Sequence, residues 1–211
     1  MTNPSWERAG RRDVVSDEEL HLIQSRVNAI KDPFYRLRTG ALISILRLTG
    51  KRRGEVASLQ VSDFAETPEL LNITFTLEKK RKGTTLSKRV TKGLPTSDPL
   101  TPPILDYLRH LQELKPTPKY FLPQTKRVFG GAPIIDPETP IKGRQVLNLF
   151  REVSDMAWPH LMRETAGAEI IKRDPTVIGV FKVKQRLDHE DLRTSLRYLE
   201  RYATDVIERE R

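Results

Sequence analysis

The sequence contains no cysteine, which excludes disulfide bonds, thiolate catalysis and cysteine-ligated zinc sites. No apolar run approaches the roughly 18 residues that a membrane-spanning helix needs, so no membrane contact is expected. Residues 1–15 carry several charged side chains and no apolar stretch follows them, unlike a secretory signal. We therefore expect a protein that remains in the cytoplasm, or one of viral or plasmid origin that acts inside its host cell.

Positive charge is what the sequence has in excess. Lys and Arg number 37 against 28 Asp and Glu, which gives a net charge of +9. Such a surplus favours a polyanionic partner, because basic side chains displace the counterions condensed on phosphates. Charge alone fits a DNA enzyme, a ribosomal protein or an RNA-binding module equally well. The length of 211 residues fits one well-packed domain.

Apolar spacing and helix-end signals predict a mainly helical α+β fold with a small antiparallel hairpin or sheet. Gly50 is expected to end the second helix in a left-handed conformation. Residues 115–142 are rich in proline and glycine and are expected to be loop. The expected helices are residues 17–31, 34–48, 54–59, one that opens at Thr101-Pro102 and includes Leu111, one around 146–153, then 160–171, 176–186 and 191–209.

Alternating apolar residues from Leu70 onward predict a strand, with a turn in residues 82–88 and a returning strand over residues 89–94. This hairpin holds the most basic part of the chain, with seven basic residues and no acidic ones between positions 79 and 92. In an arbitrary protein such a run is usually a solvated surface. The seven are Lys79, Lys80, Arg81, Lys82, Lys88, Arg89 and Lys92.

Four short stretches carry the chemistry: Thr-Gly-Lys-Arg-Arg-Gly-Glu at 49–55, His-Leu-Met-Arg at 160–163, Leu-Asp-His at 187–189, and Arg-Tyr at 197–198. In this order and spacing they resemble the tyrosine recombinases of the phage-integrase type. That family has an arginine in a T-G-x-R-x-x-E turn, a hairpin lysine, an H-x-x-R, an L-G-H, and a tyrosine nine residues after the last histidine. Tyr198 follows His189 at that spacing.

The resemblance implies the integrase-type DNA breaking–rejoining fold and an enzyme that cuts double-stranded DNA through a 3′-phosphotyrosyl link, without metal or cofactor. Tyr198 would be the nucleophile and Arg52 and Arg163 would brace the phosphate, a task that suits planar guanidinium groups. In the same family pattern His160 would help to deprotonate the tyrosine, His189 would bind a phosphate oxygen, and Lys80, or else Lys79, would protonate the leaving hydroxyl. Lys51, Arg53 and the other basic hairpin residues would bind DNA.

Two positions depart from the family pattern. Glu164 follows Arg163, and Asp188 replaces the usual glycine before His189, so both add negative charge close to a phosphate site. Three alternatives therefore stay open: a type IB topoisomerase-like enzyme that relaxes DNA, a DNA-binding accessory protein with a weakened site, and an unrelated basic RNA-binding protein.

The expected organisation is a flexible arm over residues 1–13 and a catalytic domain over residues 14–211, with no N-terminal core-binding domain present. The resemblance also implies self-association on DNA as a dimer or tetramer through residues 199–211. In the last helix, Leu192, Leu196, Leu199 and Ala203 form an apolar stripe, so Tyr198 is expected to be less core-like than Tyr202.

Overall fold

The computed structural model describes residues 14–81, 84–126, 128, 131–155 and 158–203 of the chain. The expected arm at residues 1–13 and most of the expected self-association segment lie outside this part. The helices are α1 (Asp17–Asn28), α2 (Pro33–Thr49), α3 (Arg53–Ala57), α4 (Pro102–Glu113), α5 (Gly143–Arg151), α6 (Pro159–Arg173), α7 (Val177–Leu187) and α8 (Leu192–Tyr202). The strands are β1 (Phe64–Glu66), β2 (Leu70–Arg81), β3 (Thr84–Pro95), β4 (Pro123–Lys126) and β5 (Ile134–Pro140).

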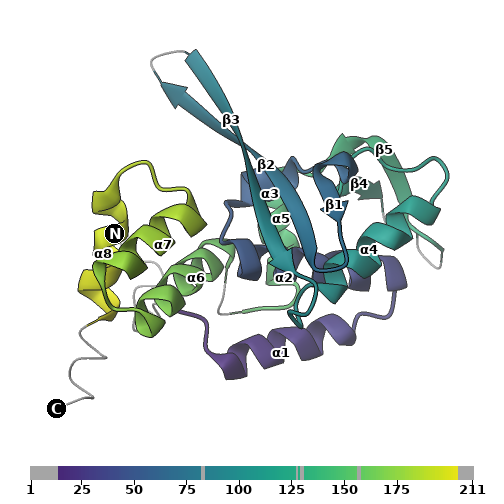
Figure 1. Cartoon of the computed structure of the whole chain (residues 1–211). Helices are drawn as coiled ribbons and strands as arrows, with labels where there is room; N and C mark the ends of the chain where they lie inside the picture. Colours follow the sequence, from purple (N-terminus) through teal and green to yellow (C-terminus); the bar gives the residue numbers. More distant parts are fainter. Residues whose placement is uncertain (1–13, 82–83, 127, 129–130, 156–157, 204–211) are drawn as a thin grey trace, which may run out of the picture.

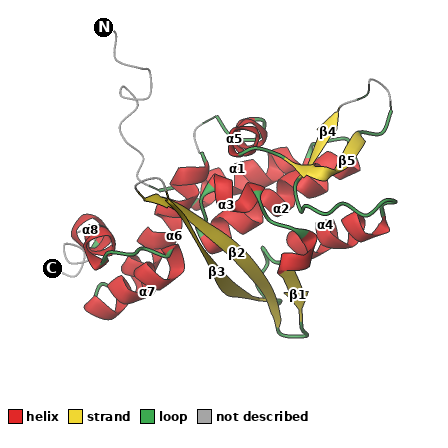
Figure 2. Ribbon diagram, turned by 90° about the horizontal axis from the view of Figure 1, so that it is seen from above, coloured by secondary structure: helices red, strands yellow, loops and turns green. Residues whose placement is uncertain are grey.

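Helix α2 is the centre of the arrangement, since it packs against α1, α4 and α6. Figure 1 shows α6, α7 and α8 together at one end of the molecule and the β4–β5 pair at the other end. The long β2–β3 hairpin lies between these ends (Figure 2), and in Figure 1 it extends beyond the body of the molecule. The fold class predicted from the sequence, mainly helical with a small antiparallel sheet, is confirmed.

The ends of the predicted helices follow local sequence signals. The Ser16 side chain accepts a hydrogen bond from the Glu19 backbone amide at 3.2 Å, as expected for a helix N-cap. Gly50 ends α2 with φ +61°, which confirms the predicted left-handed conformation. A Cβ atom at position 50 would also come within 2.5 Å of Leu187 Cδ2, so this turn can approach the end of α7 only because it holds glycine.

The sheet is larger than the sequence suggested. Strands β1, β2 and β3 form an antiparallel sheet in that order, and β3 begins at Thr84, so the predicted turn over residues 82–88 is wrong. Threonine favours extended backbone, and backbone pairing continues to Arg81 opposite Thr84. The loop prediction for residues 115–142 is also wrong in part, since it contains the β4–β5 pair. These short strands include prolines, which mask a strand pattern.

Two clusters of buried apolar residues stabilise the fold. The larger cluster includes residues of α1 to α5 and of β2, and the smaller one joins α6, α7 and α8. Tyr198 and Tyr202 both belong to the smaller cluster, with exposed fractions of 6% and 4%. The expected difference between the two tyrosines is therefore absent, since Tyr198 is as much a core residue as Tyr202. The leucine stripe of α8 is only partly buried, and its most buried helical residues are Ser195, Tyr198 and Tyr202.

In the described ranges, no helix has both the length and the apolar character that crossing a bilayer would require.

Candidate functional site

The turn between α2 and α3, the first turns of α6 and the turn between α7 and α8 meet beside α8. Arg52, Arg163, His189 and Tyr198 come from these four segments. The charges of Arg163 and Arg52 both act on His189, and the charge of Arg163 also acts on Tyr198. The ring centroids of His189 and Tyr198 are 5.8 Å apart. Four of the six predicted catalytic residues are thus brought together.

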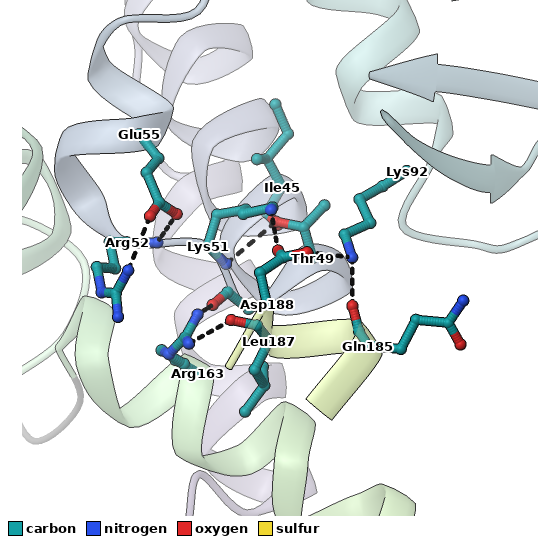
Figure 3. Close-up of polar contacts among 11 residues, drawn as sticks. Ile45, Thr49, Lys51, Arg52, Glu55, Lys92, Arg163, Gln185, Leu187 and Asp188 are labelled. Atoms are coloured by element: carbon teal, nitrogen blue, oxygen red, sulfur yellow. Dashed lines mark hydrogen bonds and ion pairs between the residues drawn. The ribbon is translucent and has the colours of Figure 1, made fainter. Parts of the chain in front are cut away.

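Arg163 is the buried centre of this group. Its guanidinium donates one hydrogen bond to the Gly50 carbonyl at 2.6 Å and another to the Leu187 carbonyl (Figure 3). These bonds hold the end of α2 and the end of α7 against α6. Burial, and then the nearby charge of Arg52, lower the pKa of Arg163. A guanidinium has more N–H groups than these two carbonyls use, so Arg163 retains donors for an anion.

Arg52 is the N-cap residue of α3. Its side chain is exposed, and the Glu55 side chain holds it in place. The Arg52 backbone amide donates to Glu55 Oε2 at 2.9 Å, and Arg52 Nη1 donates to Glu55 Oε1 at 3.1 Å (Figure 3). A glutamate at the third helical position can reach back to its N-cap, which explains the spacing of arginine and glutamate in the motif. Glu55 therefore orients Arg52 and leaves the rest of its guanidinium open to solvent.

His189 follows the end of α7 and is half-buried. Its Nδ1 atom forms a hydrogen bond of 2.9 Å with Oγ of the fully buried Ser195. Burial, together with the charges of Arg163 and Arg52, lowers the pKa of His189 to about 4. The imidazole is consequently neutral at pH 7, and Nε2 is the ring nitrogen that Ser195 leaves available.

Tyr198 lies with its ring flat on α6 at Gly167. A Cβ atom at position 167 would come within 2.4 Å of the ring atom Cε1, so glycine is required for this packing. The Glu164 carboxylate lies close enough to act on this phenol. Burial and then the Glu164 carboxylate raise the pKa of Tyr198, whereas the charge of Arg163 opposes this shift. In the free protein the candidate nucleophile is therefore a protonated phenol.

His160 lies in the first turn of α6, and its exposed side chain faces Glu164. The distance from His160 Nε2 to Glu164 Oε1 is 3.3 Å. Arg163, three residues later, is buried and faces the carbonyls of Gly50 and Leu187. From the sequence, Glu164 was only a departure from the family pattern. Its spacing of four residues from His160 could have indicated their contact, whereas nothing local indicates that it lies near Tyr198.

Asp188 ends α7 in a left-handed conformation, with φ +52°. Glycine adopts this conformation without strain, which explains the glycine expected at this position. The Asp188 carboxylate pairs with Lys51, and with Lys92 Nζ at 2.9 Å. Two lysines thus neutralise the negative charge that the sequence suggested would lie free beside a phosphate.

The prediction that Lys51 binds DNA is corrected by the structure, in which this residue lies in the interior. Its side chain is 0% exposed, pairs with Asp188 and lies 4.7 Å from the centroid of the Phe75 ring. Lys92 is also mostly buried and donates to the Gln185 carbonyl as well as to Asp188. These two lysines join the α2–α3 turn and β3 to the end of α7 (Figure 3).

Exposed positive charge surrounds the candidate site. Arg53, Lys88 and Arg89 have exposed side chains. A groove of about 880 Å³ between β3 and α7 is open to solvent beside His189, and its basic lining residues are Lys88, Arg89, Lys92 and Lys184. The side chains of Lys79, Lys80 and Arg81, and the whole of Lys82, lie outside the described residues. Within the residues that are described, no group of three acidic or histidine side chains could hold a metal ion.

Comparison with solved structures shows the class of fold. The chain is similar to XerH site-specific recombinase bound to difH substrate (TM-score 0.55, 15% identity, 89% of this chain, 50% of that one). It is also similar to XerA recombinase (TM-score 0.63, 14% identity, 99% and 67%) and to a lambda integrase dimer bound to a COC′ core site (TM-score 0.51, 14% identity, 88% and 59%). These neighbours are tyrosine recombinases, so this chain has the integrase-type catalytic-domain fold that the sequence motifs suggested.

The sequence itself is distant from known proteins. No family profile matches it, and no curated protein sequence matches it significantly. The chain spans about half the length of the XerH chain with which it was compared. At these identities the likeness establishes the fold alone.

Proposed function

We propose that this protein is a DNA strand transferase of the tyrosine-recombinase type, which cuts and rejoins double-stranded DNA through Tyr198. The observation that carries the proposal is the convergence of Arg52, Arg163 and His189 beside the one phenol that the sequence motif selects. Three groups that can donate hydrogen bonds to an anion lie next to an oxygen nucleophile. This combination suits phosphoryl transfer from a phosphodiester.

In the proposed reaction a DNA phosphate binds between Arg52 and Arg163. Both arginines donate to its non-bridging oxygens, where negative charge accumulates in the transition state. His189 donates through Nε2, because Ser195 engages Nδ1. Arg163 needs no reorganisation for this task, since two backbone carbonyls already fix its guanidinium.

Tyr198 Oη then attacks the phosphorus, and the bond from phosphorus to the 5′ oxygen breaks. The product is a 3′-phosphotyrosyl link and a free 5′ hydroxyl, protonated by a hairpin lysine for which Lys80 is proposed and Lys79 is the alternative. The covalent link retains the energy of the phosphodiester, so the reverse attack by a 5′ hydroxyl rejoins DNA without a cofactor. Arg53, Lys88 and Arg89 would contact the DNA backbone around the site.

The proposed partner is double-stranded DNA inside a cell, and strand exchange between two DNA sites would require several copies of the chain. The lambda integrase structure that shares the fold is a dimer bound to DNA, and the XerH structures are bound to their substrate. For this chain we propose self-association on DNA through residues 199–211. Integration, excision and resolution would all use the same strand-transfer step.

The test is a covalent-adduct assay. Purified protein is incubated with random-sequence duplexes that carry a 5′ label and a nick, which lets the cleaved end diffuse away, and is then denatured. We expect a labelled band at the size of the protein plus DNA with the wild type and with Tyr120→Phe, the matched control. We expect none with Tyr198→Phe, although this variant should bind DNA as the wild type does. An adduct with Tyr198→Phe would contradict the proposal, and salt-sensitive DNA binding without any adduct would favour an accessory protein.

A further inference from the structure

Helix α6 places Glu164 between two residues of the candidate site. His160 Nε2 lies 3.3 Å from Glu164 Oε1 on one side. On the other side the Glu164 carboxylate acts on the phenol of Tyr198, whose ring contacts Gly167 one helical turn further along α6. The His160 side chain is 69% exposed and the Glu164 side chain 23%. The carboxylate therefore connects a buried hydroxyl to an imidazole that is open to solvent.

The packing of Tyr198 fixes this connection. Its ring lies on Gly167, one helical turn after Glu164, and a Cβ at position 167 would overlap the ring. The hydroxyl consequently lies near Glu164 and Arg163, which are neighbours in the sequence but opposite in charge. A neutral acceptor would serve equally well for simply holding a buried tyrosine, so the carboxylate adds a capacity to take up a proton.

The charged groups around the phenol divide into two sets. Glu164 raises the pKa of Tyr198, and it also raises that of Tyr202 on the same helix. Arg163 acts in the opposite direction on Tyr198 and favours the phenolate. His160, the other titratable group in contact with Glu164, lies on the solvent side. Glu164 thus helps to keep the phenol protonated at rest and is a carboxylate placed to take up the proton when the phenol ionises.

We propose that Glu164 is the group that accepts the Tyr198 proton during strand cleavage and that His160 positions the Glu164 carboxylate from the solvent side. The inference rests on the proposed function of Tyr198. In the step, the O–H bond of Tyr198 breaks and its proton moves to a Glu164 carboxylate oxygen while Tyr198 Oη bonds to phosphorus. The phosphorus–5′ oxygen bond breaks, and the 5′ oxygen takes a proton from the hairpin lysine. Rejoining returns the proton from Glu164 to Tyr198.

The assignment changes the role expected for His160. The resemblance gave His160 the deprotonation of the tyrosine, whereas in the structure His160 faces Glu164 and Glu164 is the carboxylate that acts on the phenol. His160 is then a positioning residue that holds the carboxylate from the solvent side. Its loss should cost less than the loss of Glu164.

The experiment compares Glu164→Gln with the wild type and with Glu113→Gln, a matched control at the exposed end of α4. The rate of adduct formation is measured in single turnovers over a range of pH on the nicked random-sequence duplexes. Glutamine keeps the size and a hydrogen bond but cannot accept the proton, so we expect the rate to fall about 100-fold or more at neutral pH. The rate should then rise steeply with pH, because the phenol must ionise unaided. Added formate should restore part of the rate in Glu164→Ala but not in Tyr198→Phe.

An unchanged or increased rate in Glu164→Gln, with the wild-type pH profile, would overturn the inference while leaving Tyr198 as nucleophile. Absence of an adduct with the wild type would instead overturn the proposed function. A titration of the Tyr198 phenol tests the contact without any activity: its pKa should be lower in Glu164→Gln than in the wild type, and an equal pKa would contradict the contact. Glu164→Asp, which retains a shorter carboxylate, should keep partial activity and serves if the glutamine variant fails to fold.

Discussion

Tyr198 and Gly167 are in contact so close that a methyl group at position 167 would lie 2.4 Å from Cε1 of the tyrosine ring. The position of the candidate nucleophile therefore depends on a glycine within α6. In Gly167→Ala the ring must move away from Glu164 and Arg163, and the overpacked core should lose about 1–3 kcal/mol of unfolding free energy.

We expect Gly167→Ala to form little or no covalent adduct while it still binds DNA. Urea denaturation and the adduct assay check the two effects. The control is Gly40→Ala in α2, where a new Cβ would make only ordinary contacts, 3.6 Å from Val27 Cγ1 at the nearest. Normal cleavage by Gly167→Ala would show that the ring position does not matter for the reaction.

Arg163→Lys should lose both stability and cleavage. A lysine cannot span the carbonyls of Gly50 and Leu187 and also bind a phosphate, since it lacks the planar fork of donors. Loss of charge-assisted hydrogen bonds in the interior should lower the free energy of unfolding by about 2 kcal/mol. Arg173→Lys, at the exposed end of the same helix, is the control and should behave as the wild type. Retention of full stability in Arg163→Lys would contradict the structural role given to these two bonds.

Asp188→Asn should destabilise the protein although asparagine tolerates the left-handed backbone. The fully buried Lys51 would lose its counter-charge, and breaking a buried ion pair typically costs about 3–5 kcal/mol. The double variant Lys51→Met/Asp188→Asn should recover much of this loss, because the fully buried charge of Lys51 is then gone, while Lys92 is partly open to solvent and keeps the Gln185 carbonyl. Thermal and urea unfolding of the single and double variants measure the effect. If Asp188→Asn is as stable as the wild type, Lys51 has another partner.

His189 should titrate far below an ordinary histidine in the free protein. Burial, with the charges of Arg163 and Arg52, lowers its pKa to about 4 from 6.5. As the pH falls from 6.5 to about 4, the unfolded chain takes up this proton before the folded protein does, so this residue makes folding less favourable in acid. NMR titration of the imidazole gives the value directly. DNA binding should raise the pKa, because a phosphate favours the protonated form, and an ordinary pKa in the free protein would contradict the buried site.

Lys80 should matter for the leaving group, and a chemical substitution can separate this role from DNA binding. With an ordinary duplex, Lys80→Ala should slow adduct formation by about 100-fold or more if it supplies the proton. With a duplex whose 5′ bridging oxygen is replaced by sulfur, a good leaving group, Lys80→Ala should cleave nearly as fast as the wild type. If the sulfur-substituted duplex restores cleavage by Lys79→Ala but not by Lys80→Ala, Lys79 is the residue that protonates the leaving group.

Local signals explain what the sequence could predict. The start of α1, the left-handed Gly50 and the alternation in β2 depend on residues close in the chain, and each lies at its predicted place. The meeting of Arg52, Arg163 and His189 with Tyr198 could be expected only from the resemblance in motif order. Helical spacing by itself placed Tyr198 on the wrong side of α8.

Side-chain pairing across the fold explains what the sequence could not predict. Lys51 looked like one of many basic surface residues until Asp188, 137 positions later, proved to be its partner. Glu164 and Asp188 both appeared as unwanted negative charge, because Tyr198 lies on α8 and the lysines that pair with Asp188 lie on the α2–α3 turn and on β3. The β4–β5 pair was missed since each strand is short and gains its hydrogen bonds from the other.

Mass spectrometry of the trapped protein–DNA adduct tests the central claim most directly. Trypsin cuts after Arg197 and Arg201, so Tyr198 and Tyr202 fall on different peptides. After nuclease digestion, the account predicts that the added nucleotide mass lies on the peptide that contains Tyr198 and is attached through a 3′ phosphate. A nucleotide on the Tyr202 peptide, on any other residue, or attached through a 5′ phosphate would contradict it.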